Sequence, residues 1–176
     1  YYLFMLLTYG ATMGIFLSAN LYTTFIFFEV MSFTSYVLVA CGGEDKFHTK
    51  AANSYLAFAV LGGLMTLMGI FFIFVMTGTL EFNELSLAIQ ASPNYGTLLV
   101  AGLLVLFGFG VKAGMFPVHT WLPQSYVAAP APTTALLSSI LSKCGIFGML
   151  IITCNIFAND FNWGMIILVL GIITML

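Results

Sequence analysis

The chain has 176 residues, of which 61% are hydrophobic and only 6% are charged, and its mean hydropathy is +1.10. An average soluble domain is about one-quarter charged, so this composition excludes a protein whose whole surface faces water. Four Lys, no Arg and a formal net charge of −2 leave no basic surface for nucleic acid. The composition therefore predicts a multi-pass protein of the cell membrane (inner or cytoplasmic) that is surrounded by the lipid bilayer.

Polar residues divide the chain into about six apolar runs, and the uninterrupted runs hold the roughly 20 residues that a membrane-spanning helix needs. Backbone groups find no water partners in lipid, so the predicted fold class is all-α, a polytopic bundle of membrane helices. Both ends of the chain lie inside apolar runs, which indicates part of a longer protein. The predicted spans run from Tyr1 to about Leu17, from Leu21 to about Cys41, from about Ala51 to Met76, from near Tyr95 onward, from about Thr133 to Cys154, and from near Trp163 onward.

Residues 78–94 hold several apolar side chains among polar ones, so they are predicted to form a short interfacial helix or a loop rather than a span. Positive charge predicts the orientation. Lys46 and Lys50 both follow the second span, which assigns that end of the bundle to the cytoplasm. The opposite end would carry the acidic residues Glu81, Glu84 and Asp160, and it would have no Lys.

Two charged residues fall deep inside predicted spans. Helical rise places Glu29 roughly 12 Å and Lys143 roughly 15 Å into their spans, and Lys143 is therefore expected to be buried near the midplane. A charge at the centre of a membrane helix costs about 2.5–3.5 kcal/mol and usually marks an ion route. Alternatively, Glu29 could be a protonated packing residue, and Lys143 could form a salt bridge with another helix.

The run from Tyr95 to Ala129 is too long for one straight crossing, and it contains a third buried charge, Lys112. Pro117 and Pro123 follow that lysine. Proline removes a backbone donor and clashes with the preceding turn, so we expect the helix to break near Met115 to Pro117. Transporters use such broken helices at their ion sites. His119 lies beside this break and is predicted to be either a proton-relay group or an ordinary polar contact.

The remaining motifs are less informative. Trp121 and Trp163 lie near span ends and are predicted to be interface anchors. The three cysteines have no metal-ligand spacing. There is no CxxC, no GxGxxG after a strand and no pair of axial-ligand histidines inside a span. No cofactor and no redox chemistry are therefore expected in this chain, and electron transfer would belong to partner subunits.

Two stretches, FFEVMSFTSYVLV (27–39) and GFGVKAGMFPVHTWLPQSYVAAPAPTTALLSSILSKCGIFGM (108–149), closely resemble the antiporter-like subunits of respiratory complex I, the NADH:quinone oxidoreductase. Mrp-type cation/proton antiporters and the membrane subunits of energy-converting hydrogenases belong to the same family. The motifs occur in family order: Glu in one helix, VK before FP-H-WLP, an AP-P turn and a later K-x-G.

This resemblance implies that residues 1–176 form one proton-conducting domain, about helices four to nine of a roughly fourteen-helix protein with inverted repeats. The chain would hold nearly all of the first repeat, with one broken helix. Glu29 would match the glutamate of the fifth helix, Lys112 the lysine of the broken seventh, Lys143 the lysine of the eighth, and His119 the histidine of the FP-H-WLP element.

The implied function is proton translocation by one of the subunits of a complex I-like or hydrogenase-type respiratory complex, a translocase with other membrane subunits as partners. In this hypothesis Glu29 pairs with Lys112, and the closing and opening of the pair unload and load Lys143. Two alternatives remain open. The chain could belong to an Mrp-type Na⁺/H⁺ antiporter, or it could be a structural subunit in which the buried charges only hold helices together.

Overall fold

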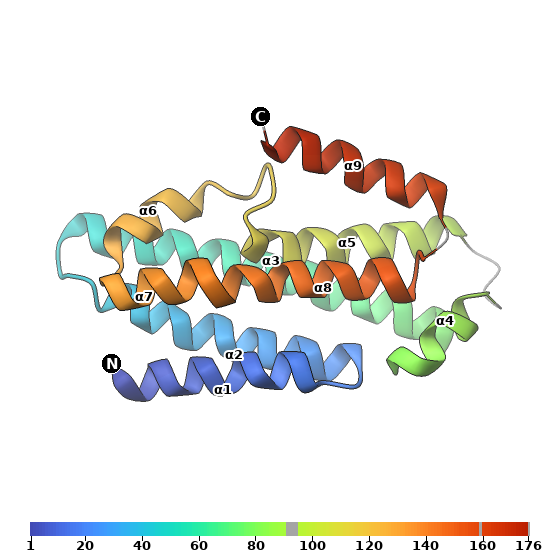
Figure 1. Cartoon of the computed structure of the whole chain (residues 1–176), viewed down its shortest axis with the longest axis horizontal. Coiled ribbons are helices and arrows are strands. Elements are labelled where there is room, and N and C mark those ends of the chain that lie inside the picture. Colours follow the sequence, from blue (N-terminus) through green and yellow to red (C-terminus); the bar gives the residue numbers. More distant parts are fainter. Residues whose placement is uncertain (91–94, 159, 176) are drawn as a thin grey trace.

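The computed structural model describes residues 1–90, 95–158 and 160–175, and its regular elements in those ranges are helices. They lie mostly along one common axis in an elongated bundle (Figure 1). This arrangement confirms the predicted all-α membrane bundle. In chain order the elements are α1 (Tyr2–Leu17), α2 (Leu21–Ala40), α3 (Lys46–Thr77), α4 (Phe82–Gln90), α5 (Tyr95–Ala113), α6 (Trp121–Ala128), α7 (Ala131–Leu136), the π-helical turn η1 (Leu137–Leu141), α8 (Ser142–Asn155) and α9 (Phe161–Met175).

Four helical segments in the described ranges are long and apolar enough to cross a membrane: α2, α3, α5 and the continuous segment Ala131–Asn155. The helices α1 and α9 are apolar but shorter. The third span begins at Lys46 rather than near Ala51, because the polar residues after Asp45 form the first helical turn instead of a loop. That helix ends at Gly78, whose φ of 72° lies in the left-handed region where glycine is favoured.

The helix α3 lies at the centre of the bundle and packs against α2, α5 and α6. Its contact with α5 is close because small residues meet there. A Cβ atom on Gly108 would fall 1.9 Å from the Thr66 hydroxyl oxygen, so only glycine leaves room for the two helices at that crossing. At the next residue of α5, the ring of Phe109 meets the ring of Phe28 from α2 edge to face, with centroids 4.8 Å apart. These contacts fix where the end of α5 lies between its neighbours.

Apart from the turn between α5 and α6, the connections between the described helices lie at the two ends of the bundle (Figure 1). At one end the backbone of Leu21 donates to Leu80 O (3.0 Å), and that of Phe82 donates to Ala19 O (3.2 Å). At the other end Gly42, in the turn that precedes Lys46 and Lys50, lies against the carbonyl of Ala128. The basic residues of α3 therefore lie at the end that holds α6, opposite the acidic α4 (Figure 1).

The helix α4 occupies most of the segment predicted to be interfacial, and it has two different faces. Leu85 is fully buried against the bundle, whereas Leu87 is 70% exposed. Of the two predicted alternatives, a short helix or a loop, residues 82–90 form the helix, while residues 91–94 of that segment lie outside the described residues.

The prediction that Trp121 and Trp163 anchor the chain at the membrane interface is wrong for both side chains. Their exposed fractions are 3% and 0%. The ring of Trp163 stacks on Phe157 at 4.0 Å between centroids, and its Nε1 donates to the Thr153 hydroxyl at 3.2 Å. A tryptophan near a helix end can equally fill space between helices when a buried acceptor is available for its N–H, and here both rings do so.

Candidate functional site around Lys112

The candidate site begins at the break between α5 and α6, near the middle of the bundle (Figure 1). The helix α5 ends at Ala113 and α6 begins at Trp121, which confirms the break predicted near Met115 to Pro117. Gly114 makes the turn possible with a φ of +78°. The carbonyl oxygens freed at the end of α5 still have partners: Gly110 O accepts from Met115 N at 2.9 Å, and Val111 O accepts from the indole N–H of Trp121 at 2.9 Å.

The role predicted for Pro123 needs a correction. This proline does not interrupt a helix, because it is the third residue of α6, in the first turn. Backbone N–H groups of a first turn have no intrahelical acceptor, so a residue without an N–H is tolerated there. Pro117, in contrast, lies within the non-helical residues 114–120, where the break was predicted.

Lys112 lies at the last turn of α5 and is 2% exposed. Its Nζ donates to the hydroxyl oxygen of Tyr55 at 2.5 Å and lies 4.0 Å from the centroid of that ring. The Tyr55 ring in turn meets Trp121 edge to face at 5.0 Å. A lysine amine removed from water is costly unless it is hydrogen-bonded, and here the acceptor is a neutral hydroxyl, while the Trp121 ring centroid lies 5.9 Å from the amine.

The hydrogen bond continues beyond Tyr55 into α2. The Tyr55 and Ser35 hydroxyl oxygens are 2.5 Å apart, and Ser35 Oγ donates to Met31 O at 2.7 Å. Each hydroxyl can therefore accept one hydrogen bond and donate another, in a chain from Lys112 to the α2 backbone. Tyr55, Ser35 and Lys112 belong to α3, α2 and α5, so the site forms only when these three helices pack together.

Glu29 lies on α2 against α3, half-buried, with its carboxylate next to Gly63. Its Oε1 is buried and has no hydrogen-bond partner. Within the described residues no Lys nitrogen lies within 4.0 Å of this carboxylate. The Glu29–Lys112 pair proposed from the sequence is therefore open in this structure, with Lys112 held by Tyr55 instead.

Lys143 is exposed, which corrects the prediction that its side chain is buried in the bundle. It follows the π-helical turn of residues 137–141, where Ser142 N–H and its hydroxyl both bond to Leu137 O, the hydroxyl at 3.0 Å. Depth along a helix follows from residue number, but the face that a side chain occupies does not. The buried neighbours Cys144 and Gly145 face α5, so Lys143 points out of the described bundle.

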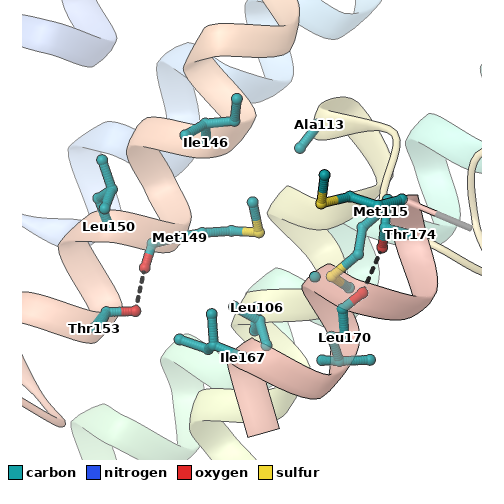
Figure 2. Close-up of a pocket in the computed structure, with 12 residues that line it drawn as sticks. Leu106, Ala113, Met115, Ile146, Met149, Leu150, Thr153, Ile167, Leu170 and Thr174 are labelled. Atoms are coloured by element: carbon teal, nitrogen blue, oxygen red, sulfur yellow. Dashed lines mark hydrogen bonds between the residues drawn. The ribbon is translucent and has the colours of Figure 1, made fainter. Parts of the chain in front are cut away.

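The outward face of α8 that carries Lys143 continues into an apolar groove of about 450 Å³ between α5, α8 and α9. Figure 2 shows Ile146 and Leu150 of α8 on one side of this groove and Ile167 and Leu170 of α9 on the other. Lys143 is thus a single charged group next to an apolar surface.

His119 lies in the turn between α5 and α6, half-buried and stacked on Phe116 with centroids 5.9 Å apart. Its Nδ1 is buried without a hydrogen-bond partner. The side chain shares no hydrogen bond with Lys112 in the described part of the chain, and it lines a separate cavity of about 520 Å³ with Gly114 and Pro123. Across the described ranges, no cluster of three His, Cys, Asp or Glu side chains has the arrangement to hold a metal ion.

Sequence reasoning did not identify Tyr55, Ser35 or the π-helical turn as parts of the site. Tyr55 did carry a signal, because its hydroxyl lies well inside the helix Lys46–Thr77, where a phenylalanine would avoid the cost of burying a polar group. The serine and the π-helical turn had no comparable signal, since small hydroxyl residues are common in membrane helices.

A protein-family model described as "NADH:quinone oxidoreductase/Mrp antiporter, TM" matches residues 18–176. The chain is 35% identical over 147 residues to one of the Na⁺/H⁺ antiporter subunits of Bacillus subtilis (strain 168), which is 84% of this chain and 30% of that protein. It is 31% identical over 176 residues to "Hydrogenase-4 component B" of Escherichia coli (strain K12), with 98% of this chain and 26% of that protein covered.

A solved structure, the Mrp complex from Dietzia sp. DQ12-45-1b, contains a chain with the same fold: the TM-score is 0.79 and the identity 29%, over 91% of this chain and 30% of that one. The chain therefore spans about 30% of the length of these relatives. It belongs to the NADH:quinone oxidoreductase/Mrp antiporter transmembrane family, the antiporter-like membrane subunits.

Proposed function

We propose that this chain carries protons across the membrane through Glu29, Lys112 and Lys143, as part of an ion-transporting subunit of a larger membrane complex. The observation that carries the proposal is the place of Lys112: fully buried, at the end of a broken helix, and bonded to a single neutral hydroxyl. A buried lysine is expensive in a membrane helix, and a purely structural role would be better served by an apolar residue.

The open Glu29–Lys112 pair supports the same proposal. Among the described residues no Lys nitrogen lies within 4.0 Å of the Glu29 carboxylate, whose buried Oε1 has no hydrogen-bond partner, although contact with Lys112 would relieve the cost of burying each charge. The lysine stem is a flexible chain of four carbons, so the amine can change partners by rotation of its side chain. When this pair closes or opens, the electric field at Lys143 would change, and Lys143 would release or take up a proton.

Lys143 is the next group in this scheme. It lies two residues before Gly145, which packs against the backbone of Ala113 at the end of α5. Lys143 would receive the proton on the outer face of α8, where the remainder of the full-length protein would continue the route. His119, with its unpartnered Nδ1 in the turn of the broken helix, would link the site to the end of the bundle that holds Lys46 and Lys50.

The identity of the complex is a second part of the proposal. The Na⁺/H⁺ antiporter relative from Bacillus subtilis, at 35% identity, and a chain of a solved Mrp complex, with a TM-score of 0.79, favour an Mrp-type antiporter subunit that exchanges Na⁺ for H⁺. The hydrogenase relative, at 31% identity, supports the other candidate, a proton-pumping subunit of a hydrogenase-type or complex I-like respiratory complex. In both cases its partners would be other membrane subunits.

The test replaces Lys112 or Lys143 by Ala in the intact protein within its complex. Both variants should lose proton transport in membrane vesicles while the complex still assembles, because the apolar core between the helices remains intact. Lys50→Ala, at the end of the bundle, is the control and should transport normally. Full transport in both Lys112→Ala and Lys143→Ala would refute the proposal, and loss of assembly together with transport would favour a structural role.

Dependence on sodium separates the two kinds of complex. An Mrp-type subunit should give proton flux that requires Na⁺ on the opposite side of the membrane, whereas a respiratory pump should give flux that requires the redox reaction of its complex. Proton flux driven by electron transfer at the same rate with and without Na⁺ would exclude the antiporter.

A further inference from the structure

We infer that Tyr55 is a positioning residue, whose hydroxyl holds the Lys112 side chain where its ion pair with Glu29 is open, and that Ser35 orients that hydroxyl. The inference rests on the proposed function, in which Lys112 alternates between partners. The inference gives Lys112 a second partner besides Glu29, the uncharged hydroxyl oxygen of Tyr55 on α3.

The hydrogen bonds have one consistent direction. Lys112 Nζ has only donors while it is protonated, so the Tyr55 oxygen must accept at the 2.5 Å contact. The Tyr55 hydrogen then points to Ser35 Oγ, which is also 2.5 Å away, and Ser35 donates to Met31 O at 2.7 Å. If Ser35 did not accept this hydrogen, the phenol could rotate it towards Lys112 and repel the amine.

The two partners of Lys112 lie at different levels of α3. Tyr55 belongs to α3, and the Glu29 carboxylate rests against Gly63 of the same helix. These positions are eight residues apart, which corresponds to about 12 Å of helical rise. In the structure the amine is bonded to Tyr55, and within the described residues no Lys nitrogen lies within 4.0 Å of the Glu29 carboxylate, so the hydrogen bond to Tyr55 competes with the ion pair to Glu29.

Packing alone does not explain the hydroxyl. The Tyr55 ring is buried against Trp121 at 5.0 Å, and a phenylalanine would keep this contact. A buried hydroxyl is tolerated only when it is hydrogen-bonded, and both bonds of this one lead towards polar groups of the site. The Tyr55 hydroxyl therefore serves the hydrogen bonds of the candidate site, whereas the ring serves the packing of the core.

The experiment compares Tyr55→Phe with Tyr36→Phe in the full-length protein within its complex. Tyr36 is a half-buried tyrosine of α2 whose hydroxyl makes no hydrogen bond in the described part of the chain, so it is a matched control. Proton flux per assembled complex should fall about tenfold in Tyr55→Phe, which corresponds to about 1.4 kcal/mol, and should change less than about twofold in Tyr36→Phe. Ser35→Ala should lower the flux in the same direction by a smaller factor, and it replaces Tyr55→Phe as the test if that variant does not assemble.

An infrared measurement separates a positioning role from a structural one. The ring band of Tyr55, identified by its loss in Tyr55→Phe, should shift in Lys112→Met, because the phenol oxygen loses its donor; the Tyr36 band should stay unchanged. If Lys112→Met stops transport but Tyr55→Phe transports like Tyr36→Phe, or if the Tyr55 band does not shift, the inference fails and the proposed function stands. Continued transport in Lys112→Met would overturn both.

Discussion

At the scale of single residues, the position of the Glu29 carboxylate depends on a glycine. A Cβ atom on Gly63 would fall 2.4 Å from Glu29 Oε1, so the carboxylate occupies space that any other residue would fill. If a larger residue replaced Gly63, the carboxylate would shift rather than the helix, because it is the movable end of a flexible side chain. Room for Glu29 beside α3 is a specific property of this position.

Gly63→Ala should displace the Glu29 carboxylate without changing any charge. We expect proton transport to fall severalfold while the complex still assembles, because the displaced carboxylate no longer meets Lys112 in the closed pair. The measurement is proton flux in vesicles, normalised to the amount of assembled complex. Gly10→Ala is the matched control, since a Cβ there would meet nothing within 4 Å; equal flux in the two variants would contradict this role of Gly63.

The charged residues of the candidate site could be predicted from the sequence, but the contacts of their side chains could not. Glu29 and Lys112 stand out because each is a lone charge in an apolar run, and the cost of such charges needs no structure to recognise. Lys143 stands out for the same reason, yet its exposure on α8 depends on which neighbours face α5. The hydrogen bond from Lys112 to Tyr55 joins residues 57 positions apart, which only helix packing brings together.

At the scale of elements, the amphipathic helix α4 closes one end of the bundle. The helix contacts α3 and α8, and its single fully buried leucine, Leu85, faces them. Two backbone hydrogen bonds, from Leu21 N to Leu80 O and from Phe82 N to Ala19 O, connect the start of α4 to the turn before α2. The stability of this end should therefore depend on one face of a short helix.

Leu85→Ala should destabilise the protein by about 2 kcal/mol or more, because it removes a fully buried side chain and leaves a cavity. Leu87→Ala, on the exposed face of the same helix, should change stability by less than about 0.5 kcal/mol. Thermal unfolding of the two variants in detergent measures the difference. Similar unfolding temperatures would show that α4 does not pack against the bundle as described.

Most elements were predictable because apolar runs and polar interruptions follow directly from the cost of burying backbone and charge in lipid. The break after Lys112 was predictable because Pro117 follows it closely. The π-helical turn before Lys143 was not, since residues 137–141 contain no proline or glycine, and its extra residue per turn is stabilised by packing and by the Ser142 hydroxyl. The extension of α3 back to Lys46 also had no signal in hydropathy.

At the scale of the whole molecule, charge divides between the two ends of the bundle. Lys46 and Lys50 lie with the turn next to α6, and Glu81 and Glu84 lie with α4 at the far end (Figure 1). The positive-inside rule then places the lysine end in the cytoplasm. This orientation stays a prediction, and it determines from which side protons would enter through the broken helix.

Cysteine labelling tests the orientation. In a variant without the three native cysteines, Lys50→Cys should react with a membrane-impermeant thiol reagent only when the reagent reaches the cytoplasmic face. Glu84→Cys should react only from the opposite face. Both positions are exposed in the structure, so access is set by the membrane rather than by burial. Labelling of both positions from one side would contradict the orientation.

Proton transport through Lys112 is tested most directly by the initial rate of proton flux into liposomes that contain the purified complex, measured with a pH-sensitive dye. Lys112→Met should reduce this rate to the level of empty liposomes, because it removes the only buried lysine amine among the described helices. Lys46→Met, an exposed lysine at the start of α3, should leave the rate unchanged. A normal rate in a fully assembled Lys112→Met complex would show that protons do not pass through the buried lysine.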